Sequence, residues 1–417
     1  MTQAQSASAA PSSAPAAQPT QRAQQIQRVL SQLEQRFSRS GDPLGPKRTL
    51  RNLDRIIKLD PWFRDRIAYN GLAEVVEWEG RRLRDEHVTS IRLAIGNTYG
   101  VEYGAEATQA IILETARQLI YHPVCDYLQG LLWDRVPRID QFLSTHIGAE
   151  DTPLLRAMSR AWFVSCVARA WGKGEAPVKV DTCLVLAGPQ GASKSTAFRV
   201  LASPRWFSDT PIDMRSKEAY TQLRGTWIWE LAELAGMRQR EAETVKAFLS
   251  APTDRYRPPY GRNVVESHRQ VVFVASTNEA TFLRDPSGAR RFWPVTVGKI
   301  DIDAIRRDRN MLWAEAMQAY RDGAVWWLSR EQDADLQAAQ GRYKQEDPWT
   351  NAIREWLPSQ PAGVSVADVL QHAVEMDTDK FGKHHEMRVS GILGSLGYQR
   401  KRVRLANGRR VWRWVAS

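Results

Sequence analysis

Lys194, Ser195 and Thr196 close a glycine-containing turn, and residues of these types in this order could bind the phosphates of a nucleotide. A lysine ammonium neutralises the charge of β- and γ-phosphates, and the hydroxyl that follows it can ligate Mg²⁺. Small residues before the lysine let backbone N–H groups converge on the same phosphates. We therefore expect an ATP and Mg²⁺ site, with the metal on Ser195, formed by Gly188, Pro189, Gln190, Gly191, Ala192, Ser193, Lys194, Ser195 and Thr196.

The flanking residues supply the elements that would position this turn. An apolar run, Cys183 to Ala187, predicts a buried strand before it, and Ala197 to Leu201 predicts a helix after it. Strand, loop and helix N-terminus in this order form a P-loop, because the helix start offers free N–H groups to the phosphates. Ser193 departs from the pattern G-x-x-x-x-G-K-[ST], which has glycine there. We expect Ser193 to adopt the turn with some strain that Gly191 relieves, and the alternative is a site that no longer binds nucleotide.

Two carboxylates follow the P-loop at a plausible distance. Thr226 to Trp229 has the pattern of a short strand ending in Glu230, and Glu233 lies three residues further on. We expect this strand to lie beside the P-loop strand, with Glu230 completing the Mg²⁺ shell and Glu233 polarising the attacking water. The alternative is a solvated helix start in which neither carboxylate has a role.

A third apolar strand pattern begins at Gln270 and ends in Asn278, whose amide could hydrogen-bond the γ-phosphate or the attacking water. Arg290 and Arg291 come next, and paired arginines can stabilise the charge of a transferring phosphoryl group, often from a neighbouring subunit. By itself such a pair would indicate only a solvated surface. The order of these elements predicts one catalytic site that contains Lys194, Glu230, Glu233, Asn278, Arg290 and Arg291.

These motifs together resemble the virulence-associated protein E family of phage and prophage proteins, which is related to superfamily III helicases and phage primase–helicases. We assign the resemblance to about residues 50 to 350. It rests on His122–Leu128, Leu132–Arg138, Leu186–Gly191, Lys194–Thr196, Trp206–Asp209, Trp229–Leu234, Asp254–Arg262, Ser276–Asn278 and Gly288–Pro294. Ser193 and Ala289 depart from the family pattern. The resemblance implies an α/β fold with an AAA+-like P-loop ATPase core, a homo-oligomeric ring, expected to be a hexamer, and ATP hydrolysis coupled to DNA replication of a mobile element.

The composition agrees with a nucleic-acid partner. The 417 residues include 58 Lys and Arg against 47 Asp and Glu, a formal net charge of +11. A basic balance favours a polyanionic partner, although it also fits simple solubility. Cys125, Cys166 and Cys183 lie in apolar or helical contexts without C-x-x-C spacing, which indicates reduced core residues of a cytoplasmic protein and no zinc site. No apolar run reaches the length of a membrane span, so we expect no membrane partner.

We divide the chain into four parts from its composition and periodicity. Residues 1–24 are rich in Ala, Ser, Gln and Pro and predict a disordered leader. Residues 25–172 have helical periodicity and predict an N-terminal helical domain. Residues 173–341 would form the P-loop ATPase domain, and residues 342–417 a linker and a C-terminal winged helix.

The C-terminal segment predicts two helices and a basic hairpin. Ser365 opens one helix, Gly397 ends the second, and Asn407-Gly408 predicts a two-residue hairpin turn. Because side chains alternate along a strand, one face of the hairpin should carry three phosphate-binding residues for duplex DNA. These residues are Arg400, Arg402 and Arg404. The alternative is a packing domain with a solvated wing.

A second DNA contact is expected within residues 254–262, where Arg257 and Arg262 flank tyrosines and could grip single-stranded DNA. A structural turn rich in Tyr and Pro is the alternative. The favoured function is an ATP-dependent replicative DNA helicase, or a helicase-loading ATPase, of a phage, prophage or phage satellite. A DNA-binding initiator or phage-interference protein that uses ATP only for assembly is the main alternative, and a small-molecule P-loop kinase is a third. Whether a primase acts from another chain stays open.

Overall fold

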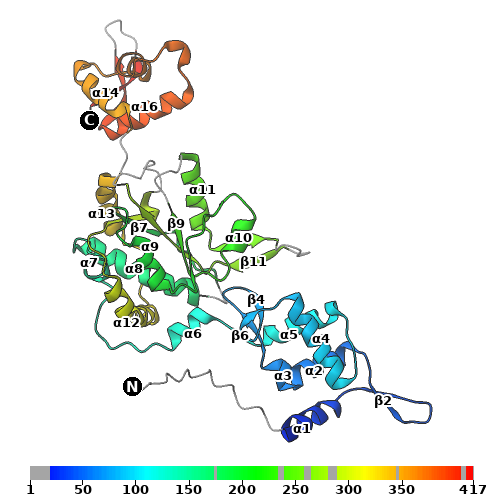
Figure 1. Cartoon of the computed structure of the whole chain (residues 1–417). Helices are drawn as coiled ribbons and strands as arrows, with labels where there is room; N and C mark the ends of the chain where they lie inside the picture. The colour runs from blue at the N-terminus through cyan, green and yellow to red at the C-terminus, as the bar shows by residue number, and fades with distance from the viewer. Residues whose placement is uncertain are drawn as a thin grey trace, which may run out of the picture.

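The computed structural model describes residues 19–172, 176–232, 239–257, 264–279, 289–343, 347–404 and 410–416 (Figure 1). The predicted leader is partly wrong, because α1 (Pro19–Leu30) already begins within it. Arg22 of this helix donates to the buried carboxylate of Asp60 through Nη2 at 2.7 Å, which ties α1 to the rest of the chain. Residues 1–18 lie outside the described part.

A five-stranded parallel sheet forms the centre of the molecule. Its strands are β7 (Cys183–Ala187), β8 (Phe207–Ser208), β9 (Ile228–Ala232), β12 (Val272–Thr277) and β13 (Phe292–Thr296). Their order is β13-β7-β12-β9-β8, and every neighbouring pair is parallel. The expectation that the acidic strand lies beside the P-loop strand is therefore wrong, because β12 lies between β7 and β9.

Helices cover both faces of this sheet, so the central strand β7 is apolar throughout. Leu184 and Leu186 of β7 pack into one hydrophobic cluster, and Cys183 and Val185 pack into another on the opposite face. The first face is covered by α8 (Pro153–Trp171), α9 (Lys194–Ala202) and α12 (Ile302–Arg321), and the second by α10 (Glu218–Gln222) and α11 (Gln239–Ser250). Between α11 and β12, the strands β10 (Thr253–Tyr256) and β11 (Val265–His268) pair as an antiparallel hairpin.

The N-terminal unit contains strands that the helical periodicity did not predict. Its helices are α2 (Leu50–Leu59), α3 (Pro61–Arg64), α4 (Asp85–Tyr99) and α5 (Ala105–Gln118). A four-stranded sheet has the order β5-β4-β3-β6, and β1 (Gln35–Phe37) pairs with β2 (Pro43–Pro46). The four strands are β3 (Ile67–Asn70), β4 (Val75–Trp78), β5 (Arg81–Arg82) and β6 (Ile120–Tyr121). Strands this short carry too few residues for a period of two to be visible.

Hydrophobic packing separates the N-terminal unit from the central unit near residue 122, not near residue 172. The N-terminal cluster runs from Val29 to Ala116. The next helices, α6 (Pro123–Gln129), α7 (Phe142–Thr145) and α8, contribute instead to the cluster on the central sheet. After α12, the helix α13 (Arg330–Gln340) completes this central unit.

The C-terminal unit has its own small core, formed by α14 (Trp349–Trp356), α15 (Val366–Asp368), α16 (Lys383–Ser395), β14 (Tyr398–Arg404) and β15 (Arg410–Ala416). Ser365 caps α15 as expected, because its Oγ accepts from the Asp368 N–H at 3.1 Å. The predicted second helix is present, and Gly397 follows it with a φ of +83°. The strands β14 and β15 pair antiparallel, and the predicted Asn407-Gly408 turn lies outside the described residues.

Candidate functional site

The loop between β7 and α9 has the backbone conformation that its sequence predicts. Gly191 has a φ of +81°, and Ser193, directly before the helix, has a φ of +62° and a ψ of +24°. This left-handed conformation strains a residue that carries a Cβ atom, so serine at this position carries the cost expected from the sequence. Gly188 is required by close packing, because a Cβ there would lie 2.5 Å from Val297 Cγ2.

Lys194 joins the loop to the neighbouring strand. Its ammonium donates to the carbonyls of Gly188 and Pro189, both at 2.8 Å, and to Oδ1 of Asn278 at 3.0 Å. Only 7% of Lys194 is exposed, and this burial lowers the pKa of its ammonium while the Glu230 charge opposes the change. Asn278 directly follows β12. The inserted strand β12 thus brings the predicted amide to the lysine.

The side chains of Ser195 on α9 and Glu230 on β9 are in direct contact. The Ser195 hydroxyl donates to Glu230 Oε1 at 2.7 Å. Glu230 is 2% exposed, and within the described residues its Oε2 is buried without a hydrogen-bond partner. Strand β9 begins two residues later than predicted, so Glu230 lies in the middle of this strand and not at its end. The charge of Glu230 also adds to the effect of burial in raising the pKa of Cys183.

These oxygen atoms fit a magnesium ion. Mg²⁺ is usually held in nucleotide sites by one or two protein oxygens together with phosphates and water, and a hydroxyl beside a carboxylate with one unpaired oxygen is such a donor set. Within the described ranges, no group of three or more His, Cys, Asp and Glu residues could hold a metal alone. Glu233, the predicted base, lies outside the described residues.

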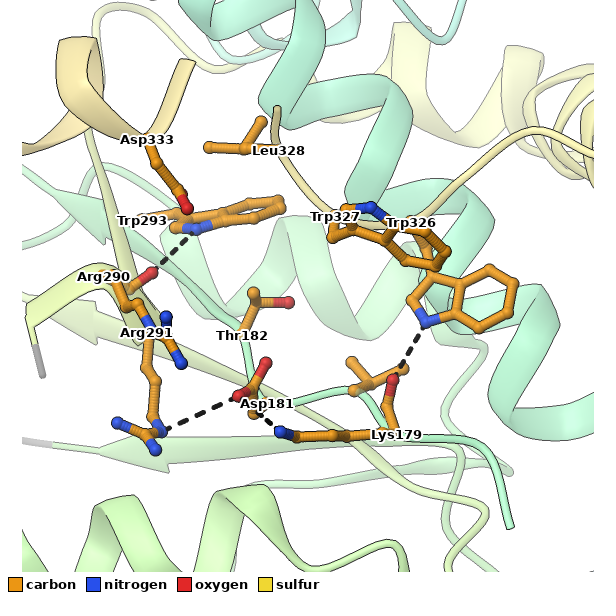
Figure 2. A pocket seen from close by; sticks show the side chains of 11 residues that line it. Lys179, Asp181, Thr182, Arg290, Arg291, Trp293, Trp326, Trp327, Leu328 and Asp333 are labelled. Carbon is orange, nitrogen blue, oxygen red and sulfur yellow. Dashed lines mark hydrogen bonds and ion pairs between the residues drawn. The ribbon is translucent and has the colours of Figure 1, made fainter. Parts of the chain in front are cut away.

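The arginine pair lies at the opposite edge of the sheet. Arg290 and Arg291 directly precede β13, whereas the P-loop follows β7, and the two strands are parallel. Each strand has five residues, so on the order of 16 Å separates the two edges at about 3.3 Å per residue. Arg291 Nε donates to Ser250 Oγ at 2.8 Å, whereas Arg290 is exposed (Figure 2). Within one chain, the structure does not bring these arginines to Lys194.

The β10–β11 hairpin carries Arg257 at the exposed end of β10, whereas Arg262 lies outside the described residues. Tyr256 of this hairpin packs inward, with its ring centroid 6.3 Å from that of Tyr220. The guanidinium of Arg224 lies 5.0 Å from the Tyr256 ring. Tyr256 therefore packs into the fold, whereas Tyr260, the other tyrosine of this segment, lies outside the described residues.

The three predicted arginines of the C-terminal hairpin are exposed, and the pairing places them on one face of β14. Arg400, Arg402 and Arg404 lie opposite Trp414, Trp412 and Arg410 of β15. The sequence analysis missed Trp412, whose ring lies 5.3 Å from the Arg400 guanidinium and 5.8 Å from that of Arg402. This tryptophan is 53% exposed. Trp412 lies among arginines in the sequence and alternates with them along a predicted strand, and this pattern could have identified it.

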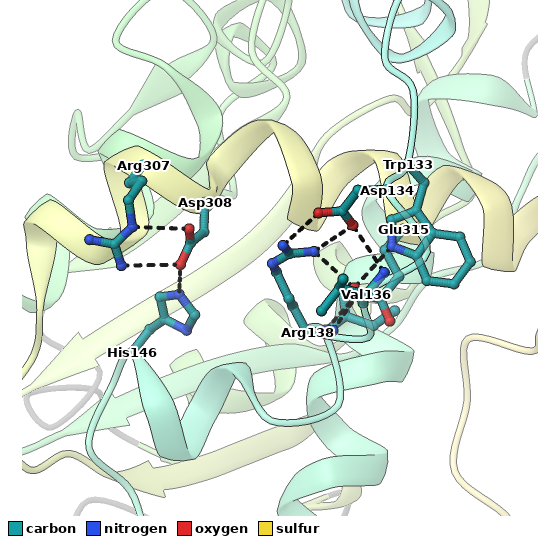
Figure 3. Close-up of polar contacts among 9 residues, drawn as sticks. Trp133, Asp134, Val136, Arg138, His146, Arg307, Asp308 and Glu315 are labelled. Carbon is teal, nitrogen blue, oxygen red and sulfur yellow. Dashed lines mark hydrogen bonds and ion pairs between the residues drawn. The ribbon is translucent and has the colours of Figure 1, made fainter.

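A polar network connects the loop before α7 to α12 (Figure 3). Asp134 accepts from Arg138 at 2.7 and 2.8 Å, and Glu315 of α12 accepts from the backbone N–H groups of Arg138 and Ile139 at 2.6 and 3.0 Å. Burial raises the pKa of Glu315, and those two N–H groups oppose the change. Arg309 and Trp313, which precede Glu315 on α12, both donate to the carbonyl of Leu201 at 2.9 Å. These two hydrogen bonds attach α12 to α9, the helix that carries Lys194 and Ser195.

Comparison with known proteins agrees with the predicted resemblance. A sequence profile of the virulence-associated protein E-like domain matches residues 128–345. No curated protein sequence matches the chain. Two apo structures of the NrS-1 C terminal region, one described as the A form, share 11% and 12% sequence identity, each with a TM-score of 0.46. In both comparisons 84% of this chain and 96% of the other are covered.

Within the described residues, no helix is long and apolar enough to cross a membrane. The matched segment begins in α6 and ends just after α13, so it coincides with the central unit defined by packing. It contains the P-loop, both strands that carry its polar partners, and the arginine pair. Because the profile covers just over half of the 417 residues, the chain belongs to the virulence-associated protein E-like family.

Proposed function

We propose that this protein is a Mg²⁺-dependent ATPase that acts on DNA as a replicative helicase, or a helicase-loading ATPase, of a phage, prophage or phage satellite. One observation carries the proposal. Lys194, Ser195, Glu230 and Asn278 come from two strands and a helix and meet beside the carboxyl end of β7. Ligands bind in this position in open α/β sheets. Membership of the virulence-associated protein E-like family supports the assignment to a mobile element.

Binding of ATP would exchange the partners of Lys194. The ammonium now contacts two loop carbonyls, and β- and γ-phosphate oxygens would replace them because they carry full negative charge. Asn278 uses Oδ1 on the lysine, which leaves its amide N–H groups to donate to the γ-phosphate or to orient water. The residues around the tip of the loop, Pro189 to Gly191, are exposed, so phosphates can reach the backbone N–H groups.

Ser195 and Glu230 would hold Mg²⁺, which neutralises charge that develops between the β- and γ-phosphates. Glu230 orients the Ser195 hydroxyl through the 2.7 Å hydrogen bond to its Oε1. The other carboxylate oxygen, Oε2, is buried and has no hydrogen-bond partner within the described residues, so it could ligate the ion. Glu233 is proposed to polarise the attacking water, as its place three residues after Glu230 suggests. Catalysis in this arrangement rests on positioning and charge, because phosphoryl transfer needs little other chemistry.

Arg290 and Arg291 are proposed to act only in an assembled ring of subunits. Because the pair lies at the amino edge of its own sheet, it can reach a nucleotide only on a neighbouring subunit, as in a homo-oligomeric ring, here proposed as a hexamer. Arg290 is the better candidate, because Arg291 is engaged with Ser250 and lies 4.0 Å from Asp181. DNA is the proposed partner of Arg257 and Arg262 in single-stranded form, and of the arginines of β14 as duplex.

One observation favours the alternative, a DNA-binding initiator or interference protein that uses ATP only for assembly. Ser193 holds the P-loop in a left-handed conformation that glycine adopts without strain. A strained loop of this kind could bind nucleotide and turn it over slowly. The two functions differ in hydrolysis and not in binding.

ATP hydrolysis and ATP binding measured on the same preparations would separate these functions. We expect Mg²⁺-dependent hydrolysis that rises with single-stranded DNA and falls at least a hundredfold in Lys194→Ala, through loss of phosphate neutralisation. Lys217→Ala, which removes an exposed lysine outside the loop, is the matched control and should match wild type. ATP-dependent assembly without turnover would favour the initiator. No ATP binding by wild type would overturn both.

A further inference from the structure

A cavity of about 430 Å³ opens at the amino edge of the central sheet (Figure 2). Its wall includes Lys179, Asp181 and Thr182, which precede β7, and Arg290 and Arg291, which precede β13. The P-loop lies at the other edge of the sheet, so this cavity is a separate site. Its size is within the range of small-molecule pockets, about 300–1,000 Å³.

An aromatic wall closes one side of this cavity. Trp326 is fixed by a hydrogen bond from its Nε1 to the carbonyl of Lys179 at 2.9 Å. Trp327 meets Trp326 edge to face, with ring centroids 5.2 Å apart, and is 55% exposed. Trp293 lies on the opposite side and donates to the carbonyl of Arg290 at 3.1 Å. Trp327 is therefore a pre-positioned exposed face on which a planar ring could stack.

The polar groups of the cavity are only partly satisfied by one another. Thr182 Oγ1 is shielded from solvent and has no hydrogen-bond partner within the described residues. Asp181 Oδ2 lies 3.6 Å from Lys179 Nζ and 4.0 Å from Arg291 Nε, so a single carboxylate forms ion pairs with two cations. Among the residues that the structure describes, none forms a hydrogen bond or an ion pair with the Arg290 guanidinium.

Asp333 supplies a second carboxylate to the cavity wall. Burial raises the pKa of Asp333, Arg290 opposes this change, and Asp181 adds to it. Three cations and two carboxylates leave one positive charge in excess. The cavity thus combines an aromatic face, an unpaired hydroxyl and a surplus cation.

We propose that this cavity binds a nucleotide unit, with its base stacked on Trp327 and its phosphate at Lys179 and, where no neighbouring subunit's nucleotide engages it, at Arg290. Bases stack on aromatic side chains whatever their identity, and arginine and lysine neutralise phosphate charge. Thr182 Oγ1 and the carboxylate of Asp333 are the polar groups of the wall that would hydrogen-bond the edge of the base. The unit could belong to single-stranded DNA or be a free nucleotide, and the two sources share this chemistry. The site does not depend on ATP hydrolysis at the P-loop.

The test uses the full chain with Lys194→Ala in every variant, so that the P-loop contributes little to binding. The first probe is an oligothymidylate that carries 5-iodouracil, photocrosslinked and mapped by mass spectrometry. The expected crosslink lies in the tryptic peptide from Asp322 to Arg330, which contains both pocket-rim tryptophans. The second probe is thymidine monophosphate in equilibrium dialysis. Trp327→Ala should weaken the binding of thymidine monophosphate about 5- to 150-fold, the loss expected when one base no longer stacks on an aromatic ring.

Trp327→Phe should retain most of the binding, because it keeps an aromatic face. Val325→Ala, an exposed position in the same segment that does not line the cavity, is the matched control. Thr182→Val keeps the shape and removes the hydroxyl, and it should weaken binding without unfolding the chain. Arg290 is left unchanged, because its proposed role at a subunit interface would give it a second effect.

Crosslinking to the Asp322–Arg330 peptide that is lost in Trp327→Ala and kept in Val325→Ala supports the proposal. Competition of that crosslink by thymidine monophosphate assigns the site to free nucleotide, and resistance to competition assigns it to the strand. Absence of the crosslink, together with thymidine monophosphate binding that is equal in Lys194→Ala with and without Trp327→Ala, overturns the proposal. In the otherwise wild-type chain, Trp327→Ala should leave basal ATPase activity unchanged, so failure here is distinct from failure of the ATPase proposal.

Discussion

The Ser195 hydroxyl on α9 donates to Glu230 at 2.7 Å, although the strand of Glu230 is separated from β7 by β12. Leu184 of β7 and Glu230 of β9 both pair with Val274 of β12, one from each side. The carboxylate therefore reaches α9 from a strand that does not touch β7. This single hydrogen bond connects the P-loop helix to the acidic strand.

The first prediction concerns Glu230. Glu230→Gln keeps an oxygen that can accept from Ser195 but removes the negative charge that would hold Mg²⁺. We expect ATP binding to persist and hydrolysis to fall on the order of a hundredfold, a typical cost of one lost electrostatic contact in a catalytic site. Glu150→Gln, at an exposed carboxylate, should have no effect. Equal hydrolysis by Glu230→Gln and wild type, measured by phosphate release, would remove Glu230 from the catalytic site.

The second prediction concerns Ser193 and its φ of +62°. Ser193→Gly relieves left-handed strain of about 1–2 kcal/mol, partly offset by the greater freedom of glycine in the unfolded chain. The free energy of unfolding should rise by about 0.5–1 kcal/mol, with ATPase activity equal or higher. Ser193→Ala keeps the Cβ atom and should show no such gain. An inert wild type that Ser193→Gly activates would show that the natural site has lost turnover.

The third prediction separates Arg290 from Arg291. Arg291→Ala removes the 2.8 Å hydrogen bond to Ser250, so it should lower thermal stability, whereas Arg290→Ala should leave stability unchanged. If Arg290 acts on a neighbouring nucleotide, specific activity should rise with protein concentration as the ring assembles. Mixing Arg290→Ala with Glu230→Gln should then restore some activity. Constant specific activity on dilution of a monomeric protein would exclude this role.

The fourth prediction concerns the basic hairpin. Replacing Arg400, Arg402 and Arg404 by Ala should weaken duplex binding and flatten its salt dependence by about one unit per lost phosphate contact. Trp412→Ala removes the exposed ring between two of these arginines and no charge, so it should weaken binding without changing the slope. Fluorescence anisotropy across salt concentrations measures both. An unchanged slope in the triple variant would assign the hairpin to protein packing.

The fifth prediction uses Asp308 of α12, which accepts from His146 at 3.0 Å. Burial by itself would raise the pKa of Asp308, but hydrogen bonds from His146 and Arg307 outweigh it and lower this pKa. A lowered folded pKa stabilises the fold above the unfolded value, about 3.9, and this contribution is lost as the pH falls through the folded pKa.

Asp308→Asn should therefore reduce the free energy of unfolding at pH 7 by on the order of 1 kcal/mol. The difference from wild type should shrink below about pH 4 and vanish in stronger acid. Chemical denaturation at several pH values measures this difference, and Asp303→Asn, an exposed acid on the same helix, is the control. A difference that does not change with pH would show that Asp308 contributes through packing alone.

Local sequence patterns predicted those parts of this protein that depend on neighbours in the chain. The strand, loop and helix of the P-loop occupy one continuous segment, so spacing alone predicted β7 with its observed bounds and the strain at Ser193. Asn278 was placed correctly for the same reason, since it follows directly on the apolar run of β12. The Ser365 cap and the two basic strands are also local patterns.

Which distant segments meet follows from the packing of the whole chain, and no local pattern predicts it. The insertion of β12 between β7 and β9 depends on how five strands share two covered faces, and no single strand carries that information. This strand order places Lys194 beside Asn278 at the carboxyl edge of the sheet. Arg290 lies at the amino edge, where it lines the same cavity as Trp327. The strands of β3 to β6 have two to four residues each, too few to display a period, so pairing alone defines them. Local propensity selects elements, whereas burial of both sheet faces selects their order.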